Sequence, residues 1–244
     1  SGWAAARADE AAPGARQGSL VASPAMSHGA VLVTGGAGYI GSHTVRALRD
    51  AGRDVVVLDS LEFGRADAVL DAPLVQGDIA DRALVEQTCR HHGVGSVIHF
   101  AAYKSVGESM SRPDRYWHNN VGGTVSLVEA VLAAGVERFV FSSSCSVYGT
   151  PAQVPVSESA PVAPESVYAE TKAMVERILG WYGVTSGLRA VSLRYFNAAG
   201  ASHDGRMGED WPYSVNLIPV AMKALILGQP KVEVFGTDYP TRDG

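Results

Sequence analysis

A glycine-rich stretch directly after the first apolar run constrains the fold of this chain more than any other feature. Residues 34–41 read TGGAGYIG, follow the run Ala30–Thr34 and precede a helical pattern. Gly35, Gly38 and Gly41 recur at a spacing that lets a chain turn tightly, approach a pyrophosphate closely and pack a helix against the strand. The free N–H groups at the start of that helix then face the phosphates. Glycines also mark ordinary turns, but the strand-loop-helix order favours a dinucleotide site.

The rest of the chain alternates short apolar runs with longer helical patterns. The run Val55–Leu58 is apolar on both faces, as in a parallel strand covered by helices on either side. Repeated alternation of this kind predicts an α/β fold, a Rossmann-type doubly wound parallel sheet. The expected strands are Ala30–Thr34, Asp54–Asp59, Pro73–Gln76, Ser96–Phe100, Arg138–Ser142 and Arg189–Tyr195, and the expected helices are Tyr39–Ala51, Arg82–His92, Asp114–Ala134 and Ser166–Trp181.

The pattern divides the chain into three parts. Residues 1–27 are rich in Ala, Gly and Ser and show no period, so we expect a non-native or disordered leader. Residues 28–197 form the predicted dinucleotide-binding domain. Residues 198–244 begin with a turn-rich loop and continue with an expected helix at Val215–Leu227 and an expected strand at Val232–Phe235. We interpret this last part as the start of a small C-terminal substrate-binding region.

Composition excludes several classes of protein. Hydrophobic residues make up 46% of the 244 residues and charged residues 18%, as in folded soluble proteins. The net charge of −5 gives no broad attraction to nucleic acid or anionic membranes. No apolar run approaches the ~20 residues that span a bilayer. Cys89 and Cys145 match no zinc or disulfide spacing, so we expect no metal site and a reducing, cytoplasmic location.

Acidic and small residues follow the next predicted strands. Asp59 ends the second strand, close to the position expected for the acid that binds the adenosine ribose, and its charge favours NAD over a cofactor with a 2′-phosphate. Asp78 follows the third strand. Ala101 and Ala102 follow the fourth, where small side chains leave room for a cofactor. Because open α/β sheets bind ligands at the carboxyl ends of their strands, we expect these residues at one site.

Tyr168 and Lys172 are candidate catalytic residues. Four residues apart on a helix, they lie on the same face, and a lysine ammonium near the phenol favours the phenolate. The tyrosine then serves as a base or an acid near neutral pH. Ser144 closes the fifth strand region, where its hydroxyl could hold a reacting oxygen against Tyr168. Tyr148 lies near Ser144, but Ala152 stands where its lysine partner would be.

The longer motifs around these residues resemble the UDP-galactose/UDP-glucose 4-epimerases of the extended short-chain dehydrogenase family. They are TGGAGYIGSH, HFAAYKSVGES, NNVGGT, FSSSCSVYG, YAETK and RYFNAAGA, and the resemblance runs from about Ala30 to Gly244. It implies a Rossmann-type NAD domain with a small C-terminal substrate domain. Family members continue with arginines that neutralise the substrate diphosphate. Arg242 is not in register with them, so we expect a C-terminally incomplete chain.

The resemblance also implies roles for individual residues. Tyr168 is similar to the family's catalytic base, Lys172 to the residue that binds the nicotinamide ribose, and Ser144 to the serine bonded to the sugar. The implied cofactor contacts are Gly35, Gly38, Tyr39, Ile40, Gly41, Asp59, Ser60, Asp78, Ile79, Phe100, Ala101, Ala102, Lys104, Asn119, Ser142, Tyr168, Lys172 and Phe196. The implied substrate contacts are Lys104, Ser144, Tyr168, Asn197, Asn216, Leu217 and Phe235.

The implied activity is NAD-dependent epimerisation at C4 of a UDP-hexose. The sugar is oxidised transiently to a 4-keto form, presents its other face and takes the hydride back, so the cofactor should stay bound through turnover. Two alternatives stay open: a catalytically incomplete NAD-binding fragment, and a related sugar-nucleotide dehydratase or decarboxylase. Dehydratases carry acids just after the active hydroxyl, whereas Cys145 and Ser146 follow Ser144 here.

Two further expectations concern the surface. The helices that carry Asn119 and Tyr168 resemble the family's four-helix dimer interface, which implies a homodimer. The segment Arg112-Pro113-Asp114-Arg115 is a charged helix entry, which we interpret as a surface cap rather than a binding patch.

Overall fold

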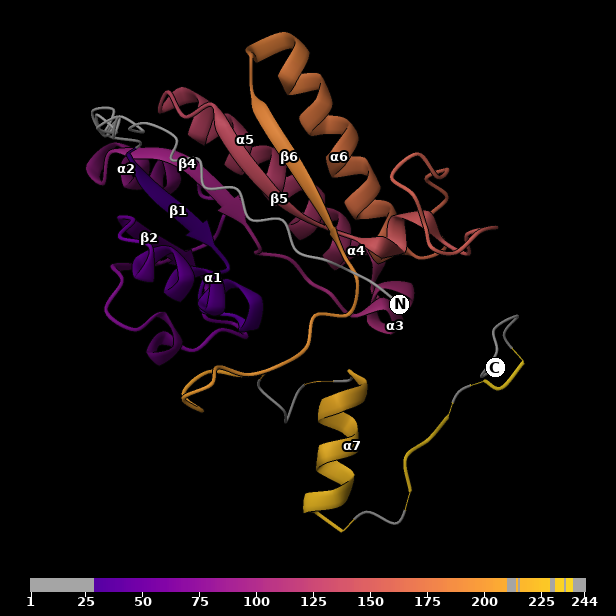
Figure 1. Ribbon diagram of the computed structural model, residues 1–244. Coiled ribbons are helices and arrows are strands. Elements are labelled where there is room, and N and C mark those ends of the chain that lie inside the picture. Colours follow the sequence, from indigo (N-terminus) through magenta and orange to yellow (C-terminus); the bar gives the residue numbers. More distant parts are fainter. Residues whose placement is uncertain (1–28, 210–213, 215, 229–230, 235, 239–244) are drawn as a thin grey trace, which may run out of the picture.

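Six parallel strands form the centre of the computed structural model, which describes residues 29–209, 214, 216–228, 231–234 and 236–238. The strand order is β3-β2-β1-β4-β5-β6, so the chain crosses over between β3 and β4. Figure 1 labels β1, β2, β4, β5 and β6 of this sheet. In such sheets the crevice for a ligand opens beside the first strand, where the winding reverses. The strands are β1 (Ala30–Thr34), β2 (Val55–Asp59), β3 (Leu74–Gln76), β4 (Val94–His99), β5 (Arg138–Ser144) and β6 (Arg189–Tyr195). The predicted doubly wound fold is confirmed.

The helices follow the strands in the expected alternation. The α-helices are α1 (Tyr39–Asp50), α2 (Arg82–His91), α3 (Val106–Ser111), α4 (Pro113–Tyr116), α5 (Thr124–Ala133), α6 (Val167–Ser186) and α7 (Leu217–Ile226). Two 3₁₀ turns, η1 (Ala66–Val69) and η3 (Cys145–Tyr148), and one π-helical segment, η2 (Trp117–Gly123), complete the set in the described chain. Within these residues every helix is too short or too polar to cross a membrane.

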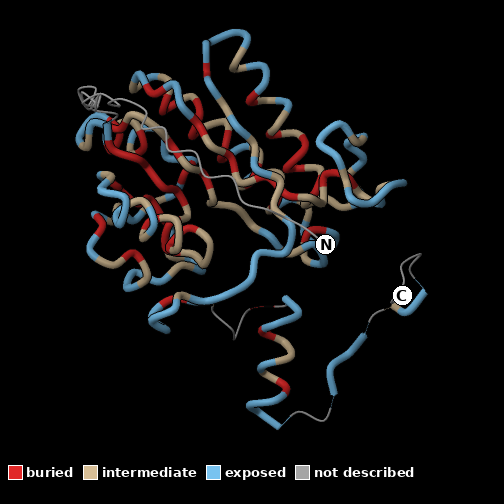
Figure 2. Tube along the Cα trace, viewed as in Figure 1, coloured by how far each residue is buried: buried red, intermediate tan, exposed pale blue. Residues whose placement is uncertain are grey.

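Two hydrophobic cores cover the two faces of the sheet. Neighbouring residues of β1 point to opposite faces, because side chains alternate along a strand. Leu32 enters the larger core, which β1 shares with α2, α5 and α6, whereas Val31 and Val33 enter the smaller core under α1 and η1. Figure 2 shows the buried residues concentrated along the strands and on the inner sides of these helices. The sheet is thereby a rigid platform for the loops at its carboxyl end.

Local signals explain where α6, the longest helix, begins and ends. The Ser166 hydroxyl accepts a hydrogen bond from the N–H of Ala169 at 3.2 Å, which satisfies one of the free N–H groups of the first turn. Gly187 follows the last turn with φ of +72°, a left-handed conformation that glycine adopts without steric cost. These two signals set the two ends of α6.

Three predictions about elements differ from the structure. The expected helix Asp114–Ala134 consists of α4, η2 and α5 in succession, and α3 was not predicted. Val232, Glu233 and Val234 form no strand, because a strand needs a hydrogen-bonded neighbour and the described sheet offers them none. Phe235 and residues 1–27 lie outside the described residues, so the leader stays a prediction.

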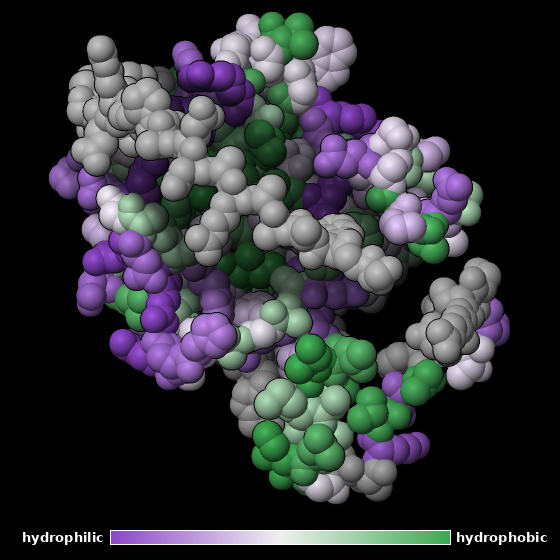
Figure 3. Space-filling model, in the orientation of Figure 1, coloured by the Kyte–Doolittle hydropathy of each residue, from purple (hydrophilic) through white to green (hydrophobic). Residues whose placement is uncertain are grey.

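Helix α7 lies apart from the sheet (Figure 1). Figure 3 shows hydrophobic residues gathered on its surface. The large exposed side chains along it are Leu217, Ile218, Met222, Leu225 and Ile226.

Candidate functional site

The glycine loop between β1 and α1 is built so that two of its glycines admit no side chain. A Cβ on Gly35, whose φ is +70°, would lie 2.5 Å from the N of Ala101, and a Cβ on Gly41 would lie 2.2 Å from the carbonyl oxygen of Gly35. Gly38 caps α1 without a side-chain hydrogen bond, so its position adds no side-chain acceptor at the positive end of the helix dipole. This arrangement suits a pyrophosphate.

Asp59 holds the glycine loop as well as facing the crevice. Its Oδ2 accepts a hydrogen bond from the N–H of Ala37 at 2.9 Å, and its Oδ1 accepts one from the N–H of Leu61 at 2.9 Å. The residue is 7% exposed. Each carboxylate oxygen has a second lone pair, so the predicted ribose contact is compatible with these bonds.

The loops after β3 and β4 come to the same edge of the sheet. Asp78 Oδ1 accepts from the N–H of Ala80 at 2.8 Å, and Ile79 is buried. The N–H groups of Phe100 and Ala101 both donate to the carbonyl of Thr34, which fixes the β4 loop beside the glycine loop. Phe100 and Ala101 are therefore adjacent to Gly35 in space.

Glu209 connects the β4 loop to the segment that precedes α7. Its Oε1 lies 3.4 Å from Nζ of Lys104, 2.7 Å from Oγ of Ser214 and 2.7 Å from Nδ2 of Asn216. The Glu209 side chain is 9% exposed. The structure therefore brings together Lys104 and Asn216, which were both predicted as substrate contacts, through a carboxylate that the sequence did not single out.

Asn120 is a second residue that sequence reasoning missed. Its Oδ1 accepts from the N–H of Tyr103 at 2.9 Å, and its Nδ2 donates to the carbonyl of Tyr103 at 2.9 Å and to Oγ1 of Thr171 at 3.3 Å. Asn119 donates to the same Oδ1 at 2.9 Å. Asn120 belongs to η2, and π-helical turns often occur at functional sites. In the sequence, the Asn-Asn pair of the NNVGG stretch was the feature that could have pointed to Asn120.

Ser144, Tyr168 and Lys172 converge at the carboxyl end of β5. The Lys172 Nζ donates to the carbonyl of Ser142 at 2.9 Å and lies 5.8 Å from the centre of the Tyr168 ring. The phenol of Tyr168 forms a hydrogen bond with the Ser144 side chain. The backbone N–H of Tyr168 donates to Ser109 Oγ at 3.1 Å. The predicted catalytic residues thus form one cluster.

Burial dominates the electrostatics of this cluster. It raises the pKa of Tyr168 above its usual value, and the hydrogen bond with Ser144, which lowers that pKa, does not outweigh it. Burial also lowers the pKa of Lys172 to about 7. The expectation that Lys172 lowers the pKa of Tyr168 is therefore wrong for this arrangement. The reason is that desolvation acts on both groups, and a lysine with this pKa is charged in only about half of the molecules at pH 7.

His99 lies behind Lys172 as a neutral residue. It is 1% exposed, its two ring nitrogens lie 2.6 Å from Thr34 Oγ1 and 2.9 Å from Thr124 Oγ1, and burial lowers its pKa to about 3. Its ring stacks on Phe141, and Lys172 Nζ lies 4.9 Å from the centre of the Phe141 ring. His99 therefore supports the lysine by packing.

An ion pair ties α6 to the ends of β5 and β6. Arg194 of β6 makes two hydrogen bonds to Glu176 of α6, at 3.0 and 2.6 Å, and a third to the hydroxyl of Tyr148 at 2.7 Å. Ser143 Oγ donates to Glu176 Oε1 at 2.5 Å. Glu176 lies four residues beyond Lys172, so it is on the same face of α6 as Tyr168 and Lys172. Tyr148 is thus a structural partner of Arg194.

Several predicted contacts lie outside this cluster. Phe196 is 61% exposed and Leu217 is 75% exposed, and Asn197 is exposed in the loop after β6. Ser60 is exposed beyond Asp59 and accepts from the N–H of Glu62 at 3.3 Å. Tyr39 donates to the carbonyl of Gly200 at 2.7 Å, and Ile40 and Gly41 lie in the first turn of α1. Phe235 lies outside the described residues. In the described part of the chain no three acidic, His or Cys residues group as metal ligands do.

Comparison with known proteins agrees with this geometry. Residues 31–243 match the model of the NAD dependent epimerase/dehydratase family. The UDP-glucose 4-epimerase of Lactobacillus helveticus is 48% identical over 215 residues, which are 88% of this chain and 65% of that protein. The UDP-glucose 4-epimerase of Rhizobium meliloti is 46% identical and 67% covered, and that of Azospirillum brasilense is 47% identical and 62% covered.

Solved structures give the same result. The UDP-glucose 4-epimerase of Brucella ovis in complex with NAD superposes with a TM-score of 0.85 at 45% identity, over 88% of this chain and 66% of that one. The enzyme of Bifidobacterium longum in complex with NAD+ and UDP superposes with a TM-score of 0.82 at 36% identity, over 88% and 67%. The chain spans about two thirds of the length of these relatives. On this match and this geometry, the chain belongs to the NAD-dependent epimerase/dehydratase family.

Proposed function

We propose that the chain is the NAD-binding and catalytic part of an enzyme that inverts C4 of a UDP-hexose, interconverting UDP-galactose and UDP-glucose. The observation that carries the proposal is the convergence of Ser144, Tyr168 and Lys172 at the carboxyl end of β5, the same edge of the sheet from which the glycine loop leaves β1. The similarity to UDP-glucose 4-epimerases over 88% of the chain supports the same reaction. Cys145 and Ser146, which follow Ser144, offer no acid for the elimination of water.

The residues at the crevice fit NAD. A Cβ at Gly35 or Gly41 would collide with backbone, so both glycines keep the loop close-packed where a pyrophosphate would lie. Asp59 presents a carboxylate at the end of β2, which suits a free ribose 2′-hydroxyl and repels a 2′-phosphate. When bound, NAD+ supplies the acceptor for the hydride from C4 and returns that hydride to the other face.

The chain's own residues move the proton and hold the sugar. Tyr168 takes the proton of the C4 hydroxyl as the C4–H bond breaks, and returns it to the C4 oxygen when the hydride comes back, so protons and electrons balance. Ser144 holds the C4 oxygen against the phenol. Lys172, in its protonated form, would offset part of the desolvation that raises the pKa of Tyr168. Lys104 and Asn216, which share a contact with Glu209, would bind the diphosphate.

Turnover by the purified chain tests the proposal. Intact mass first establishes that the sample contains these 244 residues, and UDP-galactose is then supplied with NAD+. Formation of UDP-glucose, and its loss in Tyr168→Phe, supports the proposal. NADH binding without turnover would instead favour the alternative of an NAD-binding fragment. A 4-keto-6-deoxy or decarboxylated product would favour a dehydratase or decarboxylase.

A homodimer and a cytoplasmic location are part of the same proposal. The exposed Trp181 of α6, the helix that carries Tyr168, supports a partner surface on that helix. Cys89 and Cys145 are both free, as in a reducing compartment. Sedimentation velocity should give twice the chain mass, and Trp181→Glu should lower it. Fractionation of the source cells, with a marker protein for each compartment as control, tests the location.

A further inference from the structure

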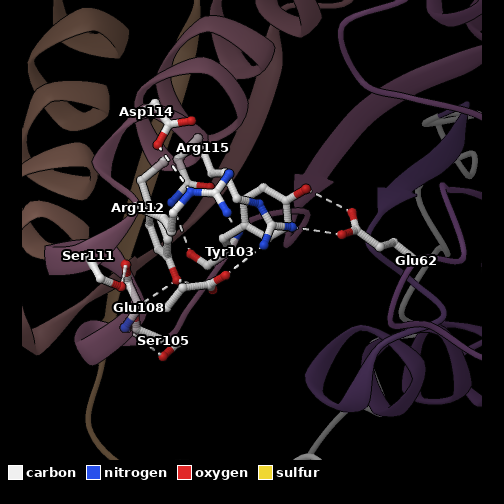
Figure 4. A network of polar contacts seen from close by, with 10 residues as sticks. Glu62, Tyr103, Ser105, Glu108, Ser111, Arg112, Asp114 and Arg115 are labelled. Atoms are coloured by element: carbon white, nitrogen blue, oxygen red, sulfur yellow. Dashed lines mark hydrogen bonds and ion pairs between the residues drawn. The ribbon is translucent and has the colours of Figure 1, made fainter.

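A bridge of side chains joins the loop after β2 to the loop after β4. Glu62 follows β2, and Tyr103 follows β4. The Tyr103 hydroxyl donates to Glu62 Oε2 at 2.8 Å, and Arg115 of α4 donates to Glu62 Oε1 at 2.8 Å. Figure 4 shows Glu62 reaching from its own loop towards Tyr103 and Arg115, with the guanidinium against the tyrosine ring. The guanidinium carbon of Arg115 lies 4.2 Å from the centre of the Tyr103 ring.

The far end of the bridge is anchored in the protein interior. Arg115 makes a second ion pair with Glu108 Oε1 at 2.6 Å. The other oxygen of Glu108 lies 2.9 Å from the hydroxyl of Tyr116, which is fully buried and also contacts the carbonyl of Ser105 at 2.8 Å. Burial raises the pKa of Tyr116 to about 12, so this phenol remains a donor. Arg115 is therefore more than the surface cap that the sequence suggested.

The sheet order places this bridge across the end of β1. Strands β2 and β4 are the two neighbours of β1, and the glycine loop leaves from the end of β1. Glu62 stands three residues beyond Asp59, and Tyr103 directly follows Ala102. A dinucleotide that contacts Asp59, the glycine loop and the Ala101–Ala102 segment must run through the space that Glu62 and Tyr103 flank.

We propose that Glu62, with Tyr103 and Arg115, retains a bound dinucleotide by closing the crevice over its adenosine half. The proposal rests on the proposed function, because it needs NAD in this crevice. It also gives that function a physical basis for keeping the cofactor through turnover, since both half-reactions use the same molecule of NAD. Glu62 and Arg115 act as retention residues, without contact to the reacting atoms.

The expected size of the effect follows from the exposure of the charges. The side chains of Glu62 and Arg115 are 45% and 27% exposed, so solvent screens their attraction. Because Glu108 anchors Arg115, the network is ordered, and we expect its contribution to lie at the upper end of the range for surface ion pairs. Loss of the bridge should therefore speed release of the nucleotide about fivefold, the factor that about 1 kcal/mol represents.

The release rate of NADH from the 244-residue chain tests the proposal. The chain is loaded with NADH and mixed rapidly with excess NAD+, and the decay of NADH fluorescence is followed. Glu62→Ala should release NADH about fivefold faster than the parent. Glu62→Gln keeps one acceptor but loses the charge, so its release rate should lie between those of the parent and Glu62→Ala. Tyr103→Phe should speed release less, and should add nothing in the Glu62→Ala background. Glu86→Ala, which removes an exposed ion pair with Arg90 on α2, is the matched control.

The outcomes separate the bridge from the function on which it rests. Faster release in Glu62→Ala but not in Glu86→Ala, with a non-additive double variant, supports the bridge. An unchanged release rate in Glu62→Ala, with normal NADH binding, overturns the bridge and leaves the proposed function standing. A parent chain that binds no NADH overturns both.

Discussion

Lys172 shows how burial sets the chemistry of a single residue. It is 4% exposed and its ammonium donates to the carbonyl of Ser142, which only partly replaces the water it has lost. The pKa consequently falls from 10.5 to about 7. The lysine thus changes charge near neutral pH, whereas burial raises the pKa of the neighbouring Tyr168 above its usual value.

This shift predicts how stability depends on pH. Between about pH 7 and pH 10.5 the unfolded chain binds the Lys172 proton and the folded chain does not, so the free energy of unfolding rises with pH in that window. The contribution of Lys172 should be about 2 kcal/mol between pH 7 and pH 9. Urea unfolding at both pH values measures it. Lys172→Met should remove most of the rise, and an equal rise in parent and variant would contradict the assignment.

Asp59 carries a structural task together with its predicted ribose contact. In Asp59→Ala the buried N–H of Ala37 loses its acceptor, so the free energy of unfolding should fall by about 1–3 kcal/mol. NADH affinity should fall at least tenfold, because the glycine loop and the ribose both lose a partner. Fluorescence titration and urea unfolding give the two numbers. Asp67→Ala, which breaks an exposed ion pair with Arg65, is the control and should leave both unchanged.

At the scale of elements, the site depends on contacts between segments that are distant in sequence. The π-helical segment η2 turns Asn120 towards the β4 loop and towards Thr171 of α6 at the same time. Glu176 and Arg194 join α6 to the two strands that end at Ser144 and Tyr195. The cofactor loop and the catalytic helix are therefore positioned by polar side chains that need not touch a ligand.

Replacement of Asn120 tests this dependence. In Asn120→Ala the N–H and the carbonyl of the partly buried Tyr103 lose their partner together, so we expect a loss of about 1–3 kcal/mol of unfolding free energy. NADH should bind more weakly as the β4 loop loses its support. Thermal and urea unfolding, with NADH titration, check both effects. His118→Ala, on the exposed side of the same segment, should behave like the parent.

Local patterns predicted the fold well, and long-range contacts limited the prediction of the site. The glycine loop, the six strands and the Tyr168–Lys172 pair were all visible, because each follows from spacing within one element. The pairing of Arg115 with Glu62 was not visible, since it joins residues of different elements that only the fold brings together. The same holds for the pKa of Tyr168, because burial depends on packing. The strand predicted at Val232–Phe235 is not formed by its described residues, Val232, Glu233 and Val234, because strand propensity alone does not supply a partner strand.

At the scale of the whole molecule, α7 departs from the packing of the rest. Leu225 is 82% exposed and Ile226 is 67% exposed, whereas the hydrophobic residues of the sheet are largely buried. Exposed hydrophobic patches on soluble proteins mark contact surfaces or aggregation sites. The 244-residue chain should therefore associate through α7 at high concentration.

Charge on α7 should reduce this association. Leu225→Glu with Ile226→Glu places two carboxylates on the exposed surface, and light scattering should show fewer large species than in the parent at the same concentration. NADH affinity should stay the same, since α7 is apart from the crevice. Equal association in parent and variant would show that α7 is not the contact surface.

The order of strands in the sheet also has a consequence for synthesis on the ribosome. Strand β1 pairs with β2 soon after both emerge, but its other neighbour, β4, begins only at Val94. Until that residue leaves the exit tunnel, the nascent chain presents one edge of β1 without a partner, and unpaired edges attract other strands. The interval between β1 and β4 is therefore the stage of synthesis at which a chaperone would help this chain most.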